Sequence, residues 1–264
     1  MSRCFDSSHL SYSRDRVWDE CQYKAHVYDT GSVISVVNQK MFIGSVVDAY
    51  VSAALSGSSI SEEDAWNNTM REMESKYKVN LADWAAAMET AHAFIQVADR
   101  EVIPVLAPEV TSVQPEWHFE IDGEQYHAHP DFVTRGGDIL DLKTTYKSFD
   151  PQRVNTDVQL TAYAYAYTTQ FGTLPNQVGI VGLVSSKRNG VTQESFIGYR
   201  SQAQVDAWLA DAKTRIAGRR WSNESGQYLR QGRASLFACN GCAVQPTCPS
   251  WMGTNLAIDS TLGE

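Results

Sequence analysis

A change in the period of the apolar residues between positions 113 and 145 constrains the fold more than any other feature of this sequence. The stretch "VQPEWHFEIDGEQYHAHPDFV" alternates apolar and polar residues, with Asp122-Gly123 between its halves, and "GGDILDLKTT" follows it. Alternation with a period of two is typical of strands, and Asp-Gly is a frequent hairpin turn. We therefore expect a hairpin and a third, neighbouring strand near the middle of the chain.

Segments with helical periodicity precede and follow these strands in the sequence. At 264 residues the chain can bury one substantial core, so we expect one α/β domain over residues 1–264 with a central sheet flanked by helices. The expected helices cover residues 10–28, 39–55, 62–78, 81–103, 155–171 and 201–221, and two later strands lie in "QVGIVGLVSS" and "ESFIGYR".

Composition excludes some classes of protein and leaves others open. No apolar run is long enough to span a membrane and the polar N-terminus has no signal-peptide core, so a cytoplasmic protein is expected. The net charge of -9 argues weakly against a nucleic-acid partner, but residues 61–124 are acidic and residues 185–234 are basic. Such an asymmetry can guide a polyanion, although an ordinary solvated surface explains it equally well.

Two acids and a lysine lie in or beside the central strands. In "ILDLKTT", Asp141 and Lys143 point to the same face, which Asp131 on the preceding strand can also reach. Two carboxylates held together repel unless a cation lies between them, and oxygen ligands suit Mg²⁺ or Mn²⁺. A lysine beside the metal can orient or help to deprotonate a water, or stabilise charge on a phosphate. These residues fit metal-assisted hydrolysis of a phosphodiester.

An Asp–Lys ion pair at a sheet edge explains the same three residues. An acid two positions before a lysine occurs three times in the chain, so the tripeptide alone is weak evidence. Gln159 and Tyr163 lie four residues apart on one helix face, where both can bond to a phosphate or to the attacking water, or form the polar edge of a core. Glu116 on the first strand can add a carboxylate.

Taken together, Asp131, Asp141-x-Lys143 and Gln159-x-x-x-Tyr163 resemble the PD-(D/E)xK nuclease superfamily in its RecB/AddB-like branch, and "HPDF" retains the proline before the first acid. The resemblance implies a restriction-endonuclease-like core, which is a mixed central sheet flanked by helices. It also implies that Asp131 and Asp141 bind Mg²⁺ or Mn²⁺, that Lys143 assists the water or the transition state, and that Gln159 and Tyr163 position the water or the backbone.

The chain departs from this branch on an early helix. There the branch carries G-x-x-x-H, whose histidine binds metal, whereas "GSVVD" places Asp48 four residues after Gly44. Asp48 can still be a ligand, but a harder and negatively charged one, which changes the expected metal preference. Spacing does not decide whether His127 or His129 takes the place of that histidine. The helical insert over residues 60–105 has no counterpart in the resemblance.

Three cysteines lie close together near the C-terminus. Cys239, Cys242 and Cys248 have the spacing C-x2-C-x5-C, and a closed metal site needs a fourth ligand from far away. Cys21 is the natural choice, because the expected helix over residues 10–28 turns it inward. Metal binding is favoured over disulfides in a reducing cytosol, and four thiolates can hold Zn²⁺ or an iron–sulfur cluster.

The helix around Cys21 resembles the S-x-S…C…Y helix of iron–sulfur members of the same branch. In those members one N-terminal and three C-terminal cysteines hold a [4Fe–4S] cluster. The resemblance therefore implies an iron–sulfur region, formed by residue 21 and residues 235–250, that joins the chain ends and is structural because it closes a very long loop. Cys4 is expected to be a free thiol.

The function that the resemblance implies is a DNA nuclease. We expect an exonuclease on single-stranded DNA or DNA ends, in recombination, repair, or phage or CRISPR DNA processing, with partner proteins from those pathways. The alternatives are a structure-dependent endonuclease, a non-catalytic DNA-binding or assembly subunit, and a zinc-stabilised structural protein. Trp221 either stacks on a base or packs in the core, and the cations expected to follow the phosphates are Arg215, Arg219, Arg220, Arg230 and Arg233.

Overall fold

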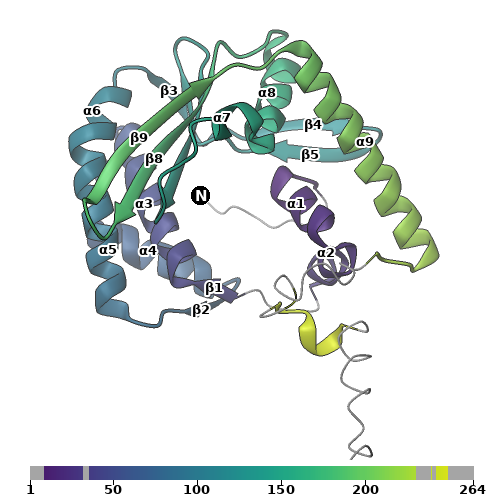
Figure 1. Cartoon of the computed structure of the whole chain (residues 1–264), viewed down its shortest axis with the longest axis horizontal. Helices are drawn as coiled ribbons and strands as arrows, with labels where there is room; N and C mark the ends of the chain where they lie inside the picture. The colour runs from purple at the N-terminus through teal and green to yellow at the C-terminus, as the bar shows by residue number, and fades with distance from the viewer. Residues whose placement is uncertain (1–8, 32–35, 230–238, 240–241, 249–264) are drawn as a thin grey trace, which may run out of the picture.

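Runs of helices and runs of strands follow one another along the chain (Figure 1). The computed structural model describes residues 9–31, 36–229, 239 and 242–248. The helices are α1 (Tyr12–Glu20), α2 (Gln22–Asp29), α3 (Gln39–Leu55), α4 (Glu62–Glu74), α5 (Trp84–Val97), a π-helical turn (Ala98–Val102), α6 (Ile103–Leu106), α7 (Arg153–Thr156), α8 (Val158–Phe171), α9 (Gln202–Ser225) and a 3-10 turn (Gln245–Thr247). The strands are β1 (Val36–Asn38), β2 (Lys78–Asn80), β3 (Val110–Val113), β4 (Trp117–Ile121), β5 (Glu124–Ala128), β6 (Phe132–Thr134), β7 (Ile139–Thr145), β8 (Val178–Ser186) and β9 (Gly190–Gly198).

A five-stranded mixed sheet forms the centre of the fold. Its order is β3-β6-β7-β8-β9, with β7 and β8 parallel and the other neighbours antiparallel. The parallel pair needs a long crossover, which α7 and α8 provide. This arrangement confirms the expected α/β fold with a mixed central sheet and is consistent with a restriction-endonuclease-like core.

Helices cover both faces of this sheet because its strands are apolar on both sides. Leu140 and Leu142 of β7 pack into one core with residues of α3, α4 and α5. Ile139, on the opposite face of the same strand, packs into a second core with α8, α9 and the β4–β5 hairpin. Side chains at odd-numbered positions of β7 therefore face α8. No helix in the described part of the chain is both long and apolar enough to cross a bilayer.

The hairpin turn is confirmed, but its place in the sheet differs from expectation. Asp122 and Gly123 both adopt positive φ angles between β4 and β5. The hairpin then forms a separate two-stranded sheet instead of joining β7. The ladder stops because Pro130, just after β5, has no N–H to donate and turns the chain toward β6. The edge strand β3 was not expected from the sequence.

The expected single helix over residues 10–28 is wrong, because it breaks at Cys21. Cys21 has an extended backbone with φ -166° and ψ 112°, ending α1 and preceding α2. Its side chain is half-buried at the junction instead of lying on the inward face of one continuous helix. By contrast, the structure confirms α3 over the predicted range, with the Asn38 side chain accepting a hydrogen bond from the Met41 N–H.

A glycine on α3 allows this helix to lie against β7. A Cβ at Gly44 would lie 2.9 Å from Oγ1 of Thr144 on β7. We expect Gly44→Ala to lower the free energy of unfolding by about 1–3 kcal/mol, as overpacked sites do. Thermal unfolding will measure this change. Adding Thr144→Ala should recover most of the loss, and a double variant no more stable than Gly44→Ala would contradict close helix–strand packing as the reason for the glycine.

Candidate active site

One cleft brings most of the predicted site residues together. It has a volume of about 740 Å³ and lies between α1, α3, the hairpin, β7 and α8. Glu116 does not line it; its exposed carboxylate lies 3.8 Å from Nε2 of His118. The predicted residues that line the cleft are Asp48, Asp131, Asp141, Lys143, Gln159 and Tyr163.

The two central acids are buried side by side at the start of β6 and in β7. Asp131 and Asp141 expose only 7% and 2% of their surfaces. Oδ2 of Asp131 accepts a hydrogen bond of 2.8 Å from the backbone N–H of Leu142. The antiparallel register of β6 and β7, with Phe132 opposite Leu140, places Asp131 beside Asp141. The strand pairing therefore fixes the two carboxylates at one place in the cleft.

Lys143 connects these acids to α8. Its Nζ lies 2.7 Å from Oδ2 of Asp141 and donates to Oε1 of Gln159 at 3.3 Å. Nε2 of Gln159 in turn donates to the hydroxyl of Tyr163 at 2.7 Å. A continuous row of polar contacts thus runs from the sheet to the helix. It holds the ammonium group where it can face a phosphate in the cleft.

Burial and charge shift the pKa of both members of the Asp141–Lys143 pair upward. Burial raises the pKa of Asp141 to about 7, against the opposing effect of Lys143 and with a further contribution from Asp131. Burial lowers the pKa of Lys143, but the carboxylates of Asp141 and Asp131 raise it more. The lysine therefore stays protonated. An additional cation beside Asp141 would favour the ionised form of its carboxyl group.

Asp48 reaches the same cleft from α3 and is held by a residue that the sequence did not single out. Nε2 of Gln114 donates to Oδ2 of Asp48 at 2.9 Å and to Oγ of Ser52 at 3.1 Å. The Gln114 backbone N–H donates to the carbonyl of Asp131 at 2.8 Å. Gln114 adopts a positive φ of 47°, which is uncommon for a residue other than glycine. One strained residue therefore connects two of the cleft acids.

Two more residues missed by the sequence prediction fix the start of α8. The Asp157 side chain caps this helix by accepting from the N–H groups of Gln159 and Leu160. Arg200 is buried and donates to the carbonyls of Val154 and Asp157 at 2.8 and 3.0 Å. Asp157 followed by an apolar helix is a recognisable capping signal, whereas no sequence pattern indicates the role of Arg200.

The structure places the predicted phosphate-binding arginines in ion pairs. Arg215 and Arg219 of α9 both pair with the buried Asp15 of α1. Arg220 pairs with Glu124 of the hairpin at 2.9 Å. These contacts hold α9 to α1 and to the hairpin, away from the cleft lining. Arg230 and Arg233 lie outside the described residues. The cations that do line the cleft include Arg14, Arg16, Lys40 and Arg153.

Histidines gather at one edge of the cleft. The rings of His9, His118 and His127 have centroids 5.7 to 6.2 Å apart, and His129 lies 4.8 Å from His127. Burial, together with the neighbouring histidines, lowers the pKa of His127 to about 4. His127 and His129 both line the cleft with Asp131, and the lowered pKa of His127 keeps its imidazole neutral near pH 7.

The four predicted cysteine ligands come from distant segments that lie together. Burial raises the pKa of the Cys239 thiol, and nearby Cys242, Cys21 and Cys248 contribute to the rise. The hydroxyl of Tyr23 on α2 donates to the carbonyl of Thr247 at 3.1 Å. All four thiols are free and half-buried. Among residues that the structure describes, no three His, Cys, Asp or Glu side chains already form metal-ligand geometry. Cys4 lies outside the described residues.

The sequence profile of the PD-(D/E)XK nuclease superfamily matches residues 9–249. The chain belongs to the PD-(D/E)XK nuclease superfamily. No curated protein matches the chain in sequence.

Two solved structures are similar to this chain at low sequence identity. A presumed exonuclease from Eubacterium rectale has a TM-score of 0.61 and 13% identity, covering 87% of each chain. The alkaline exonuclease LHK-Exo from Laribacter hongkongensis has a TM-score of 0.30 and 13% identity, covering 74% of this chain and 95% of its own. The first similarity shows a shared fold, and the second carries no weight in assigning function.

Proposed function

We propose that the protein is a divalent-metal-dependent deoxyribonuclease that acts on single-stranded DNA or on DNA ends. One observation carries the proposal: the buried pair Asp131 and Asp141 meets the ion-paired Lys143 in an open cleft of a superfamily nuclease. We place it in recombination, repair, or phage or CRISPR DNA processing in the cytoplasm, with partner proteins from those pathways.

Asp131 and Asp141 would hold Mg²⁺ or Mn²⁺, with Asp48 as a further oxygen ligand from α3. The donor set fits such an ion, because two buried carboxylates need positive charge and hard oxygen ligands suit these cations. When bound, the ion supplies an activated water and positive charge for the scissile phosphate. The imidazoles of His127 and His129 remain alternative ligands to Asp48.

The remaining cleft residues would act on the phosphate and the water. Protonated Lys143 would stabilise the charge that develops on the phosphate oxygens. Gln159 and Tyr163, which are hydrogen-bonded to each other, would orient the water or the DNA backbone. Lys40 and Arg153 at the cleft walls take over the phosphate contacts that the sequence assigned to α9.

Cys21, Cys239, Cys242 and Cys248 would hold one [4Fe–4S] cluster. The donor chemistry fits, since four free thiols from both ends of the chain lie near one another. We propose that the cluster is structural and that residues 1–264 form one nuclease domain. Within it, the insert over residues 60–105 packs its helices α4 and α5 against α3, and we propose that it narrows the approach of the DNA strand.

Metal binding should depend on pH because Asp141 must lose a proton. Because its pKa is about 7, the Asp141 carboxyl group of the metal-free site is mostly protonated below pH 7 and mostly ionised above it. We expect Mn²⁺ to release about one proton on binding near pH 6 and almost none near pH 8. Titration calorimetry in two buffers of different ionisation enthalpy will measure this release. Equal affinity and no proton release at both pH values would contradict the role of Asp141.

Asp48 should determine which metal the site uses. Asp48→His replaces an oxygen ligand with a softer nitrogen, so we expect the ratio of the Mn²⁺-supported to the Mg²⁺-supported cleavage rate to rise several-fold. Cleavage rates at saturating metal will show this ratio. If Asp48→Ala keeps full activity with both ions, Asp48 is not a ligand.

Substrates with blocked ends test the proposed activity. Labelled single-stranded DNA blocked at the 5′ end, the 3′ end, both ends or neither is incubated with Mg²⁺ or Mn²⁺. An exonuclease loses activity with one block, whereas a structure-dependent endonuclease cuts the doubly blocked strand. Binding without cleavage of any substrate would indicate a non-catalytic subunit, and absence of both binding and cleavage would indicate a structural protein.

A further inference from the structure

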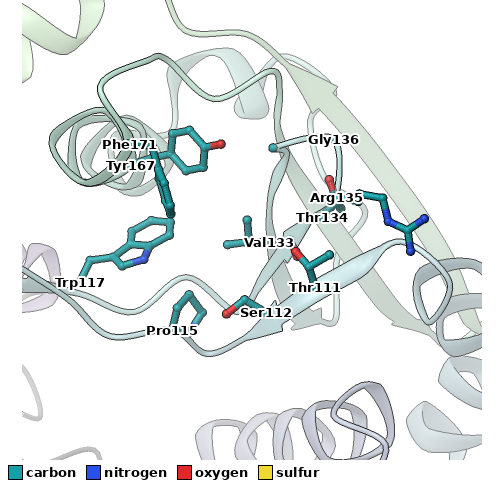
Figure 2. A pocket seen from close by; sticks show the side chains of 11 residues that line it. Thr111, Ser112, Pro115, Trp117, Val133, Thr134, Arg135, Gly136, Tyr167 and Phe171 are labelled. Carbon is teal, nitrogen blue, oxygen red and sulfur yellow. The ribbon is translucent and has the colours of Figure 1, made fainter.

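A second, smaller pocket lies beyond the catalytic cleft at the edge of the central sheet. Its volume is about 300 Å³. Residues of β3, β4 and β6, the Gly136–Gly137 turn and the last turns of α8 form its walls. Figure 2 shows an aromatic side formed by Trp117, Tyr167 and Phe171, with Thr111 and Ser112 across from them. None of these side chains has a role in the proposed chemistry.

The aromatic side presents ring surfaces at the pocket. The ring centroids of Tyr167 and Phe171 are 4.5 Å apart, and that of Trp117 lies 5.8 and 5.9 Å from them. Phe171 exposes 53% of its surface although it belongs to this cluster. An aromatic group on the pocket wall that is half open to solvent can stack on a planar ligand.

Polar groups that lack partners line the same pocket. Among the described residues, nothing accepts a hydrogen bond from the indole N–H of Trp117, and the hydroxyls of Tyr167 and Ser112 make no hydrogen bond. The indole N–H also keeps some solvent access, unlike the sealed indole groups of Trp66 and Trp208. The pocket thus offers one donor and two groups that can donate or accept. If an apolar side chain occupied the pocket, these three groups would remain without hydrogen bonds.

One face of α8 connects this pocket to the catalytic cleft. Gln159, Tyr163, Tyr167 and Phe171 are spaced four residues apart and form a single row, with about 6 Å of helix rise per step. The first two line the cleft and the last two line the pocket. The pocket also adjoins β6, which begins immediately after Asp131. A strand that leaves the acids along α8 therefore reaches the pocket within a few nucleotides.

We propose that this pocket binds a single nucleobase of the DNA strand on which the nuclease acts. The inference rests on the proposed function and identifies a base-binding subsite for it. A nucleobase is flat and carries hydrogen-bonding groups at its edge, so it matches both the aromatic wall and the unpartnered polar groups. The volume lies at the lower end for ligand pockets and suits one ring system. Gly137, with a positive φ and no Cβ, lets the Tyr167 hydroxyl pack closely against this wall, because a Cβ there would lie 2.7 Å from that hydroxyl.

A scan with abasic sites tests the subsite directly. Asp131→Asn protein, which keeps the fold but should not cut, is titrated with single-stranded oligonucleotides of one length that lack one base at successive positions, and binding is followed by fluorescence anisotropy. Phe171→Ala is added in the same background. Tyr199→Ala, between β9 and α9, is the matched control, because Tyr199 is 66% exposed and does not line the pocket. Tyr167→Phe tests the hydroxyl without removing the ring.

We expect loss of one particular base to weaken binding about tenfold, and Phe171→Ala to weaken binding of the intact strand by a similar factor. In Phe171→Ala that abasic site should have no additional effect, while Tyr199→Ala should retain the full abasic effect. Equal abasic profiles in the parent and in Phe171→Ala would overturn the subsite while leaving the nuclease intact. If the wild-type protein neither binds nor cuts DNA, the proposed function fails and the subsite fails with it.

Discussion

Replacing Asp141 or Asp131 with asparagine should lower the rate of DNA cleavage on the order of a thousandfold or more. Asparagine keeps the size of each side chain and can still accept the Leu142 hydrogen bond at position 131, so the fold should persist. What is lost is the negative charge that would hold the metal. Single-turnover cleavage of labelled single-stranded DNA will measure the effect, and DNA binding should change little because the phosphates contact other residues.

The chain contains a matched control for this experiment. On α9, Asp211 and Lys213 repeat the Asp-x-Lys spacing found in β7. Asp211 is exposed there. Asp211→Asn should therefore cut DNA at the wild-type rate. Lys143→Ala should also lose most activity, because no other cationic side chain lies against Asp141 among the described ion pairs. Undiminished cleavage by Asp131→Asn or Asp141→Asn, with contamination excluded, would refute the assignment of these acids.

Loss of any one of the four cysteine ligands should release the cluster and destabilise the protein. Cys21→Ser removes the ligand from the N-terminal part of the chain, so the C-terminal ligands would no longer be linked to it. We expect the free energy of unfolding to fall on the order of 3–5 kcal/mol, comparable to opening a cross-link across a long loop. Anaerobically purified wild-type protein should be brown and contain iron and sulfide in equal amounts, whereas Cys21→Ser should be colourless.

Cys4→Ser is the control for that substitution and should change neither colour nor stability. A colourless anaerobic wild-type preparation with stoichiometric zinc and no iron would overturn the cluster but retain the four-cysteine site. A brown Cys21→Ser protein with a full cluster would overturn the ligand assignment, and Cys4 would be the next candidate.

The arrangement of side chains on and around β7 was predictable because it depends on residues that are close in sequence. Alternation places Asp141 and Lys143 on one face of a strand, and the Gly136–Gly137 turn returns the chain so that Asp131 lies beside them. Helical spacing likewise pairs Gln159 with Tyr163, as the structure confirms. In each case the interacting residues are close in sequence, so periodicity alone indicates which side chains meet.

Contacts between distant segments could not be predicted in this way. Gln114 and Asp48 are 66 positions apart and meet only because Gln114 adopts a left-handed backbone conformation after β3. Counting charges along the sequence likewise does not show such contacts. The basic run near the end of α9 suggested phosphate binding, but Arg219 is buried against Asp15, 204 positions away. Net charge over a window of sequence does not show which charges the fold neutralises.

Metal dependence of DNA cleavage by the purified wild-type protein tests the central claim most directly. The protein is treated with a chelator, transferred to metal-free buffer and mixed with labelled single-stranded DNA, before and after Mg²⁺ or Mn²⁺ is added back. We predict no cleavage by the stripped protein, recovery that saturates with added metal, and no recovery in Asp141→Asn. Cleavage at the full rate without added divalent metal, or equal recovery in wild-type and Asp141→Asn proteins, would contradict the account.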